Sequence, residues 1–169
     1  MTTIPPQPGD FAVVSVGGPV GRAIAVGEWL NGDGFGDFEH AFIYIGSGRV
    51  IQAEPGGAAE AALTPHAQIL WSSDVIPLTD PQRKAICDAA RGYVGVPYSF
   101  ADYAALAAHR LHIPAPGLRA YIGSSKSMIC SQLVDQCYAD AGVHLYTDSR
   151  WPGFVTPASL AGLIRRQSA

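Results

Sequence analysis

Cys130 is the residue of the chain that is best placed for chemistry. It follows the polar run 124–127 and lies in the first turn of a helix that we expect over residues 129–141, where apolar residues recur at helical spacing. Unpaired backbone N–H groups and the helix dipole favour a thiolate there, and the same N–H groups can hold an oxyanion. Free cysteines are more often small buried hydrophobic residues, which is our interpretation of Cys87 and Cys137 in the middle of expected helices. Cys130 is therefore the candidate nucleophile.

A cysteine nucleophile needs an imidazole beside it, and the chain has five histidines. We favour His40, because it begins an expected hairpin strand on which a rigid scaffold would hold it; a purely structural histidine is the alternative. His66 and His144 lie in expected loops. His109 and His112 are spaced i, i+3 at an expected helix end, but no third ligand accompanies them at metal-binding spacing. We therefore expect no metal site.

The clearest local structure is a hairpin that would carry His40. Its strands are the β-rich runs 40–45 and 49–53, joined by Gly46-Ser47-Gly48, which suits a loop with a bulge. With Ile45 opposite Arg49, alternation places two sets of side chains on one face of the hairpin. These are His40, Phe42 and Tyr44 from the first strand, and Val50, Gln52 and Glu54 from the second.

The other expected elements place strands mostly in the first half of the chain and helices in the second. Further strands are expected over 11–16, 69–71 and 75–78, and further helices over 21–30, 81–93, 100–111 and from Pro157 to the pair Arg165-Arg166. Asp80 is expected to cap the second of these helices, and Thr156-Pro157 the last. This order favours an α+β fold in a single domain, residues 1–169.

Composition excludes several classes of protein. Of the 169 residues, 48% are hydrophobic and 15% charged, which excludes disorder for most of the chain. The net charge is −3 and the cations are scattered, so we expect no nucleic-acid partner. No apolar stretch is long enough for an integral membrane segment. The N-terminus lacks the pattern of a signal peptide, and three cysteines make no disulfide framework, so we expect a cytoplasmic protein as synthesised.

Several of these segments together resemble a known family. Residues 130–142 resemble the nucleophile helix, and residues 40–53 the histidine hairpin, of circularly permuted NlpC-type papain-like cysteine peptidases and amidases of the YiiX-like branch. The hairpin is equally similar to that of lecithin:retinol acyltransferase relatives. The segments 9–11, 95–98 and 155–157 also fit, so the resemblance extends from residue 9 to about residue 160.

The resemblance implies a fold and a set of site residues. The fold is papain-like, with a central antiparallel sheet packed against helices, permuted so that the histidine strand precedes the cysteine helix. Cys130 would be the nucleophile and His40 the base, with no cofactor. The third, orienting residue falls at Gln52, where relatives carry His or Glu, and Glu54 on the same face is the alternative. Tyr98 would line the substrate cleft.

The resemblance also implies a thiol hydrolase that cuts amide bonds through a thioester on Cys130, with peptidoglycan stem peptides as the favoured substrate. An enzyme encoded by a phage, or delivered to the cell wall by another route, would explain the missing export signal. An acyltransferase or thioesterase acting on lipid-like or acylated small molecules is the alternative. A non-catalytic binding or virion protein that retains the fold is a third possibility. Nothing in the sequence indicates the oligomeric state.

Overall fold

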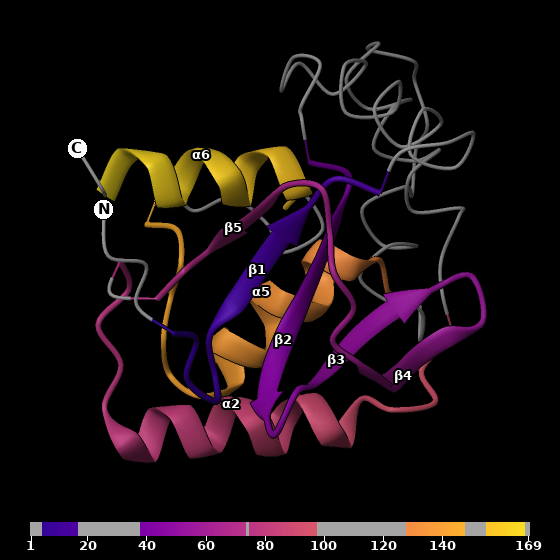
Figure 1. The fold of residues 1–169 in the computed structure, drawn as a ribbon. Helices are drawn as coiled ribbons and strands as arrows, with labels where there is room; N and C mark the ends of the chain where they lie inside the picture. Colours follow the sequence, from indigo (N-terminus) through magenta and orange to yellow (C-terminus); the bar gives the residue numbers. More distant parts are fainter. Residues whose placement is uncertain (1–4, 17–37, 74, 98–127, 148–154, 168–169) are drawn as a thin grey trace, which may run out of the picture.

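The computed structural model describes residues 5–16, 38–73, 75–97, 128–147 and 155–167, and these form an α+β fold. Figure 1 shows the arrangement, in which an antiparallel sheet of five strands has the order β4-β3-β2-β1-β5. The strands are β1 (Phe11–Val14), β2 (His40–Gly46), β3 (Arg49–Glu54), β4 (Gly57–Ala62) and β5 (Ile69–Trp71). The helices of the described residues are α2 (Asp80–Gly92), α5 (Cys130–Asp140) and α6 (Pro157–Gln167). The expected α+β class is confirmed.

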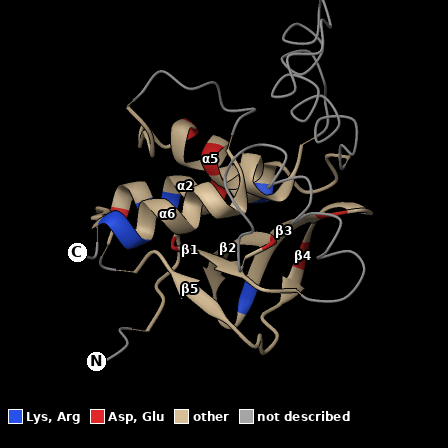
Figure 2. Ribbon diagram, turned by 90° about the horizontal axis from the view of Figure 1, so that it is seen from above, with Lys and Arg blue, Asp and Glu red and all other residues tan. Residues whose placement is uncertain are grey.

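The three helices lie together on one side of the sheet, as the view from above in Figure 2 shows. Helix α5 packs against β2 and β3, α2 packs against α5 and β2, and α6 contacts β1 and β5. The main core forms between the layers, because alternate residues of each strand, such as Val13, Ile43 and Ile51, point toward Leu133 and other buried residues of the helices. The start of α5 is thereby held against the central strands.

The hairpin of β2 and β3 has the register that the sequence predicts. Phe42 pairs with Gln52 and Tyr44 with Val50, so the expected set of side chains shares one face. The turn itself is tighter than expected, because Gly46 pairs with Arg49 and the irregularity falls between Tyr44 and Gly46. Ser47 and Gly48 form this turn with φ angles of 52° and 68°, as in the primed turns that match strand twist.

The face of the sheet away from the helices, here called the outer face, has a smaller apolar cluster of its own, formed by Ala12, Val14, Phe42 and Val50. Residues 63–68, the crossing segment, connect β4 to β5, which lie at opposite edges of the sheet. The segment therefore crosses the outer face (Figure 1), and Leu63 packs on the cluster. Its ends are fixed by hydrogen bonds from Leu63 N to Gly48 O and from Ser15 N to Gln68 O.

One strand prediction was wrong, and one strand was not predicted. Residues 75–78 form a turn and an irregular segment before α2, in which the backbone N–H groups of Val75 and Ile76 both donate to Ser72 O. The apolar side chains that suggested a strand are there because they pack on the core. Conversely, β4 was not expected after the break at residues 55–57. Its alanine-rich sequence has weak strand propensity, and pairing with β3 along its whole length makes it a strand.

The helix predictions need one correction. Thr79, not Asp80, is the N-cap of α2, because its Oγ1 accepts from Gln82 N while Gln82 Oε1 accepts from Thr79 N. The cap of α6 is as expected, with Thr156 Oγ1 accepting from Ser159 N at 3.1 Å. The strand expected over 11–16 ends at Val14. The helices expected over 21–30 and 100–111 lie outside the described residues.

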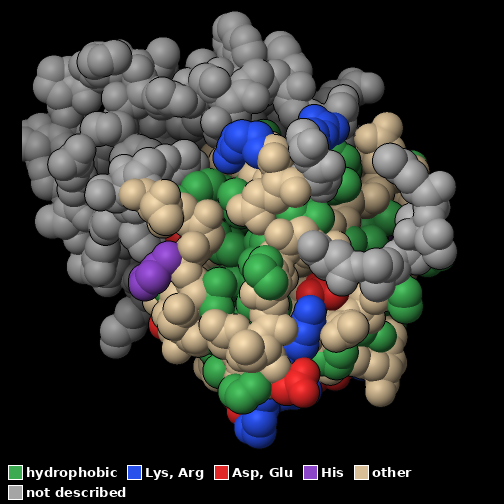
Figure 3. Space-filling view, turned by 90° about the vertical axis from the view of Figure 1, so that its left-hand side faces the viewer, with side chains coloured by type: hydrophobic (Ala, Val, Ile, Leu, Met, Phe, Trp, Pro, Cys, Tyr) green, Lys and Arg blue, Asp and Glu red, His purple; other side chains and the backbone are tan. Residues whose placement is uncertain are grey.

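Charged side chains are thinly spread over the described surface. On the face seen in Figure 3, lysines and arginines are scattered, some beside Asp or Glu side chains and others among hydrophobic and uncharged groups. Among the described residues, no helix has both the length and the apolar character that crossing a bilayer requires.

Candidate active site

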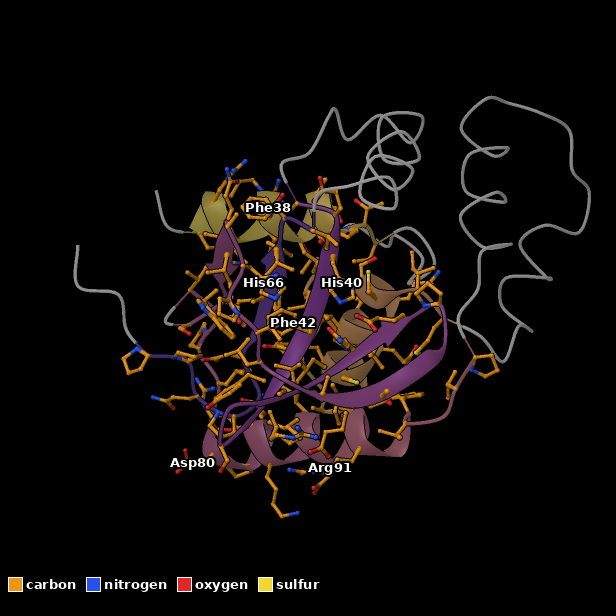
Figure 4. The ribbon with its side chains drawn as sticks, turned by 45° about the vertical axis from the view of Figure 1, so that its right-hand side comes forward. Phe38, His40, Phe42, His66, Asp80 and Arg91 are labelled. Atoms are coloured by element: carbon orange, nitrogen blue, oxygen red, sulfur yellow. The ribbon has the colours of Figure 1, made fainter. Side chains whose placement is uncertain are left out.

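His40 is the first residue of β2, at the end of the sheet where α5 begins. Alternation along the strand places its side chain on the same face as Phe42, and it is only 8% exposed. Gln52 of β3 lies diagonally across the ladder from it, and His40 Nε2 and Gln52 Oε1 are 2.9 Å apart. Figure 4 shows His40 and Phe42 grouped with His66 along β2. The imidazole is therefore held by the sheet rather than by a loop.

Cys130 is the first residue of α5, and it is fully buried. Its sulfur is hydrogen-bonded to the imidazole of His40, so the two side chains that the sequence singled out are in direct contact. The sulfur also accepts hydrogen bonds from the backbone N–H groups of Ser131 and Ala41. The ladder between β2 and β3 begins only at Phe42–Gln52, which leaves the N–H of Ala41 for the sulfur.

The start of α5 is fixed by two buried hydrogen bonds. Gln132 Oε1 accepts from Ile129 N at 2.9 Å, which satisfies a backbone donor just before the helix. Ser131 Oγ donates to Val155 O at 2.6 Å, which ties the first turn of α5 to the segment before α6. The position of the Cys130 sulfur beside β2 is therefore set by the residues on both sides of it.

The surroundings of the pair favour its charged form. Burial by itself would lower the pKa of His40, but the Cys130 thiolate, the hydrogen bonds to Cys130 and Gln52, and the charge of Glu54 together raise it to about 8. Burial would likewise raise the pKa of Cys130. The charge of His40, its hydrogen bond and the two backbone donors outweigh burial, and the pKa of Cys130 is lowered. The pair therefore tends toward thiolate and imidazolium.

The other two cysteines have the opposite electrostatics. Burial raises the pKa of Cys87, whose Sγ lies 3.9 Å from Tyr44 O. Burial, together with the charge of Asp140, raises the pKa of Cys137 well above its ordinary value. Both are buried among hydrophobic residues, in agreement with their interpretation from the sequence. Of the three thiols, only that of Cys130 is placed where a thiolate is favoured.

The two candidates for the orienting residue occupy successive positions in one chain of hydrogen bonds. Gln52 contacts the imidazole directly, and its Nε2 donates to Glu54 Oε1 at 2.9 Å. Glu54 is exposed and lies one step further from the imidazole. Tyr98 falls outside the described residues.

His66 is a neighbour of the site that the sequence did not single out. The crossing segment brings its ring to 5.9 Å from that of Phe42, and the ring of His40 lies 6.4 Å from the same phenyl group. Burial and the nearby charge of His40 lower the pKa of His66. No local pattern marks this histidine, because its position depends on β4 and β5 lying at opposite edges of the sheet.

Within the described ranges, no cluster of three or more His, Cys, Asp or Glu residues has a metal-binding arrangement. No protein-family model matches the chain, and no curated protein matches it either. The functional argument therefore rests on the geometry of the site.

Proposed function

We propose that the protein is a cysteine-dependent hydrolase of amide bonds, with Cys130 as nucleophile and His40 as general acid and base. The observation that carries the proposal is the contact between these two side chains, with two backbone N–H groups on the same sulfur. Contact between a thiol and an imidazole is the arrangement by which cysteine enzymes generate their nucleophile. A histidine strand that precedes a cysteine helix also agrees with a permuted papain-like fold.

The reaction would run in two stages. The Cys130 thiolate attacks the carbonyl carbon, a C–S bond forms, and the carbonyl electrons move onto oxygen. Backbone N–H groups at the start of α5 would stabilise this oxyanion. Collapse of the intermediate breaks the C–N bond, and the leaving amine takes its proton from the His40 imidazolium. Neutral His40 then removes a proton from water, which attacks the thioester and releases the acid and the thiolate.

Access to the sulfur requires movement. Cys130 has no exposed surface and His40 only 8%, so a carbonyl carbon reaches the sulfur only after neighbouring groups shift. We infer that acylation includes a local opening step, as in many enzymes whose catalytic groups are shielded from water.

The substrate that we favour is the stem peptide of peptidoglycan, which offers the amide bonds that such a site would cut. Intact-protein mass spectrometry after mixing with muropeptides, and separately with acyl thioesters, tests both the nucleophile and the substrate class. We expect an acyl adduct on the wild-type protein and none on Cys130→Ser, which keeps the size of the side chain. Adducts from acyl thioesters alone would favour the acyltransferase alternative. If neither substrate class gives an adduct, and Cys130 alkylates no faster than Cys87 and Cys137, the protein is not a thiol hydrolase.

A further inference from the structure

The hydrogen bonds around Gln52 leave only one orientation for its side-chain amide. An ionised carboxylate can only accept hydrogen bonds, so the group that Gln52 presents to Glu54 has to be its NH2. The carbonyl oxygen of the same amide is then the atom that faces His40 Nε2. Glu54 therefore determines which end of the amide meets the imidazole.

The orientation of the amide in turn determines the tautomer of His40. Oε1 of Gln52 is an acceptor, so His40 Nε2 has to carry a proton. Nδ1 is the ring nitrogen left for the sulfur of Cys130, and in neutral His40 it is unprotonated and able to take the proton of the thiol. A flipped amide would place a donor against Nε2 and favour the tautomer with its proton on Nδ1, which cannot act as a base toward sulfur.

We propose that Glu54 is a positioning residue that acts through Gln52 and fixes the proton of neutral His40 on Nε2. The catalytic consequence rests on the proposed function, whereas the tautomer is a property of the protein itself. The amide of Gln52 cannot fix its own orientation, because its oxygen and nitrogen ends are similar in size and differ only in hydrogen bonding. The fixed charge at Glu54 determines it.

Glu54 is well suited to a test because its side chain is exposed. Its backbone pairs with Gly57 at the end of the β3–β4 ladder, so a change of side chain leaves the ladder and the core intact. Glu60 of β4 is a matched control. It is also a carboxylate of the sheet, but it pairs with Arg49 at 2.8 Å instead of with the site.

The experiment compares Glu54→Gln with Glu60→Gln. In Glu54→Gln we expect the nitrogen NMR signals of neutral His40 to show a larger share of the tautomer protonated on Nδ1. We also expect the midpoint of the pH profile of Cys130 alkylation to rise by about one pH unit, or roughly tenfold less thiolate below the midpoint. Glu60→Gln should change neither. An equal effect of the two substitutions would overturn the proposal.

A second background tests the route through Gln52. In Gln52→Glu, residue 52 is itself an acceptor at both oxygens, so adding Glu54→Gln should no longer alter the tautomer. It should slow alkylation less than in the wild-type protein, because only the charge of Glu54 beside His40 is then lost. If Glu54→Gln slows the alkylation of Cys130 equally in both backgrounds, Glu54 acts by its charge alone, which contradicts the proposal. The tautomer is read without any substrate. A protein with the expected tautomer shift but no acyl adduct would refute only the hydrolase, and adducts without a tautomer shift would refute only the role of Glu54.

Discussion

At the scale of single residues, the site depends on a buried thiol and a buried imidazole that stabilise each other in the charged form. Desolvation opposes both charges, so neither group alone would be ionised in this position. Their mutual contact, the hydrogen bonds that the sulfur accepts from the N–H groups of Ala41 and Ser131, and the hydrogen bond that Gln52 Oε1 accepts from His40 offset that cost. Because the two groups are coupled, the loss of either one changes the titration of the other.

The pKa of His40 predicts the alkaline limit of the acylation step. The imidazolium is the proton donor to the leaving amine, and it loses its proton as the pH rises through about 8. We expect the rate of acyl-enzyme formation from an amide substrate to fall above that pH, measured by rapid quenching and intact-mass analysis. Formation from an activated ester, whose leaving group needs no proton, should continue. A decline at the same pH with both substrates would show that His40 is not the general acid.

At the scale of elements, the site lies where the start of α5, the first residue of β2 and the middle of β3 meet. The crossing segment adds His66 on the outer face, with the ring of Phe42 in contact with both histidines. The three elements contribute the side chains of Cys130, His40 and Gln52, and the pairing register of β2 with β3 aligns His40 with Gln52. The arrangement therefore depends on backbone pairing more than on flexible side chains.

The position of the crossing segment predicts an electrostatic coupling between the two histidines. The charge of His40 contributes to the lowered pKa of His66, after burial. In His40→Ala this charge is absent and burial remains, so the pKa of His66 should rise toward its ordinary value. Proton NMR of the His66 ring across pH measures the change, and Glu60→Gln, which removes a carboxylate that pairs with Arg49, is the control. If the titration of His66 is the same in His40→Ala as in the wild-type protein, the two histidines are not electrostatically coupled and the prediction is wrong.

The parts of this arrangement that could be predicted are those with a local signal. The alternation of side chains along the two strands and the glycine-containing turn predicted that His40 and Gln52 share one face. The expected start of the helix predicted that Cys130 lies in its first turn. β4 could not be predicted, because alanine has little strand propensity and the strand exists through its pairing with β3. The position of His66 depends on the order of the strands in the sheet. The N–H of Ala41 is available to the Cys130 sulfur only because the ladder between β2 and β3 begins at Phe42, one residue after Ala41. Neither property is encoded locally.

At the scale of the whole molecule, a buried ion pair joins the chain before β1 to the first turns of α2. Asp10 is 1% exposed and accepts from Arg83 at 2.7 Å, from Gln7 N at 2.8 Å and from Ser73 Oγ at 2.9 Å. The hydroxyl group of Tyr138 on α5 donates to Gly9 O. Gly9 itself has a φ of 92°, and a Cβ there would lie 3.0 Å from Arg83 Cα, so the contact requires glycine.

Removal of the buried carboxylate should destabilise the fold strongly. We expect Asp10→Ala to lower the free energy of unfolding by about 3–5 kcal/mol, because it leaves the Arg83 guanidinium without its partner in a largely buried place. The exposed pair of Arg49 and Glu60 is the comparison, and Glu60→Gln should cost less than about 1 kcal/mol. Denaturant unfolding of both variants measures the difference, and equal values would mean that the Asp10 pair is not a structural link.

The most direct test of the thiolate–imidazolium pair is a titration of the ultraviolet absorbance of the Cys130 thiolate. The signal is the difference between the wild-type protein and Cys130→Ser across pH, with Cys87 and Cys137 present in both. We expect a midpoint below that of an ordinary thiol, because the charge of His40 and the backbone N–H donors lower the pKa of Cys130. The midpoint should rise in His40→Ala. A midpoint at or above the ordinary value, unchanged in His40→Ala, would contradict the pair and the enzyme proposed from it.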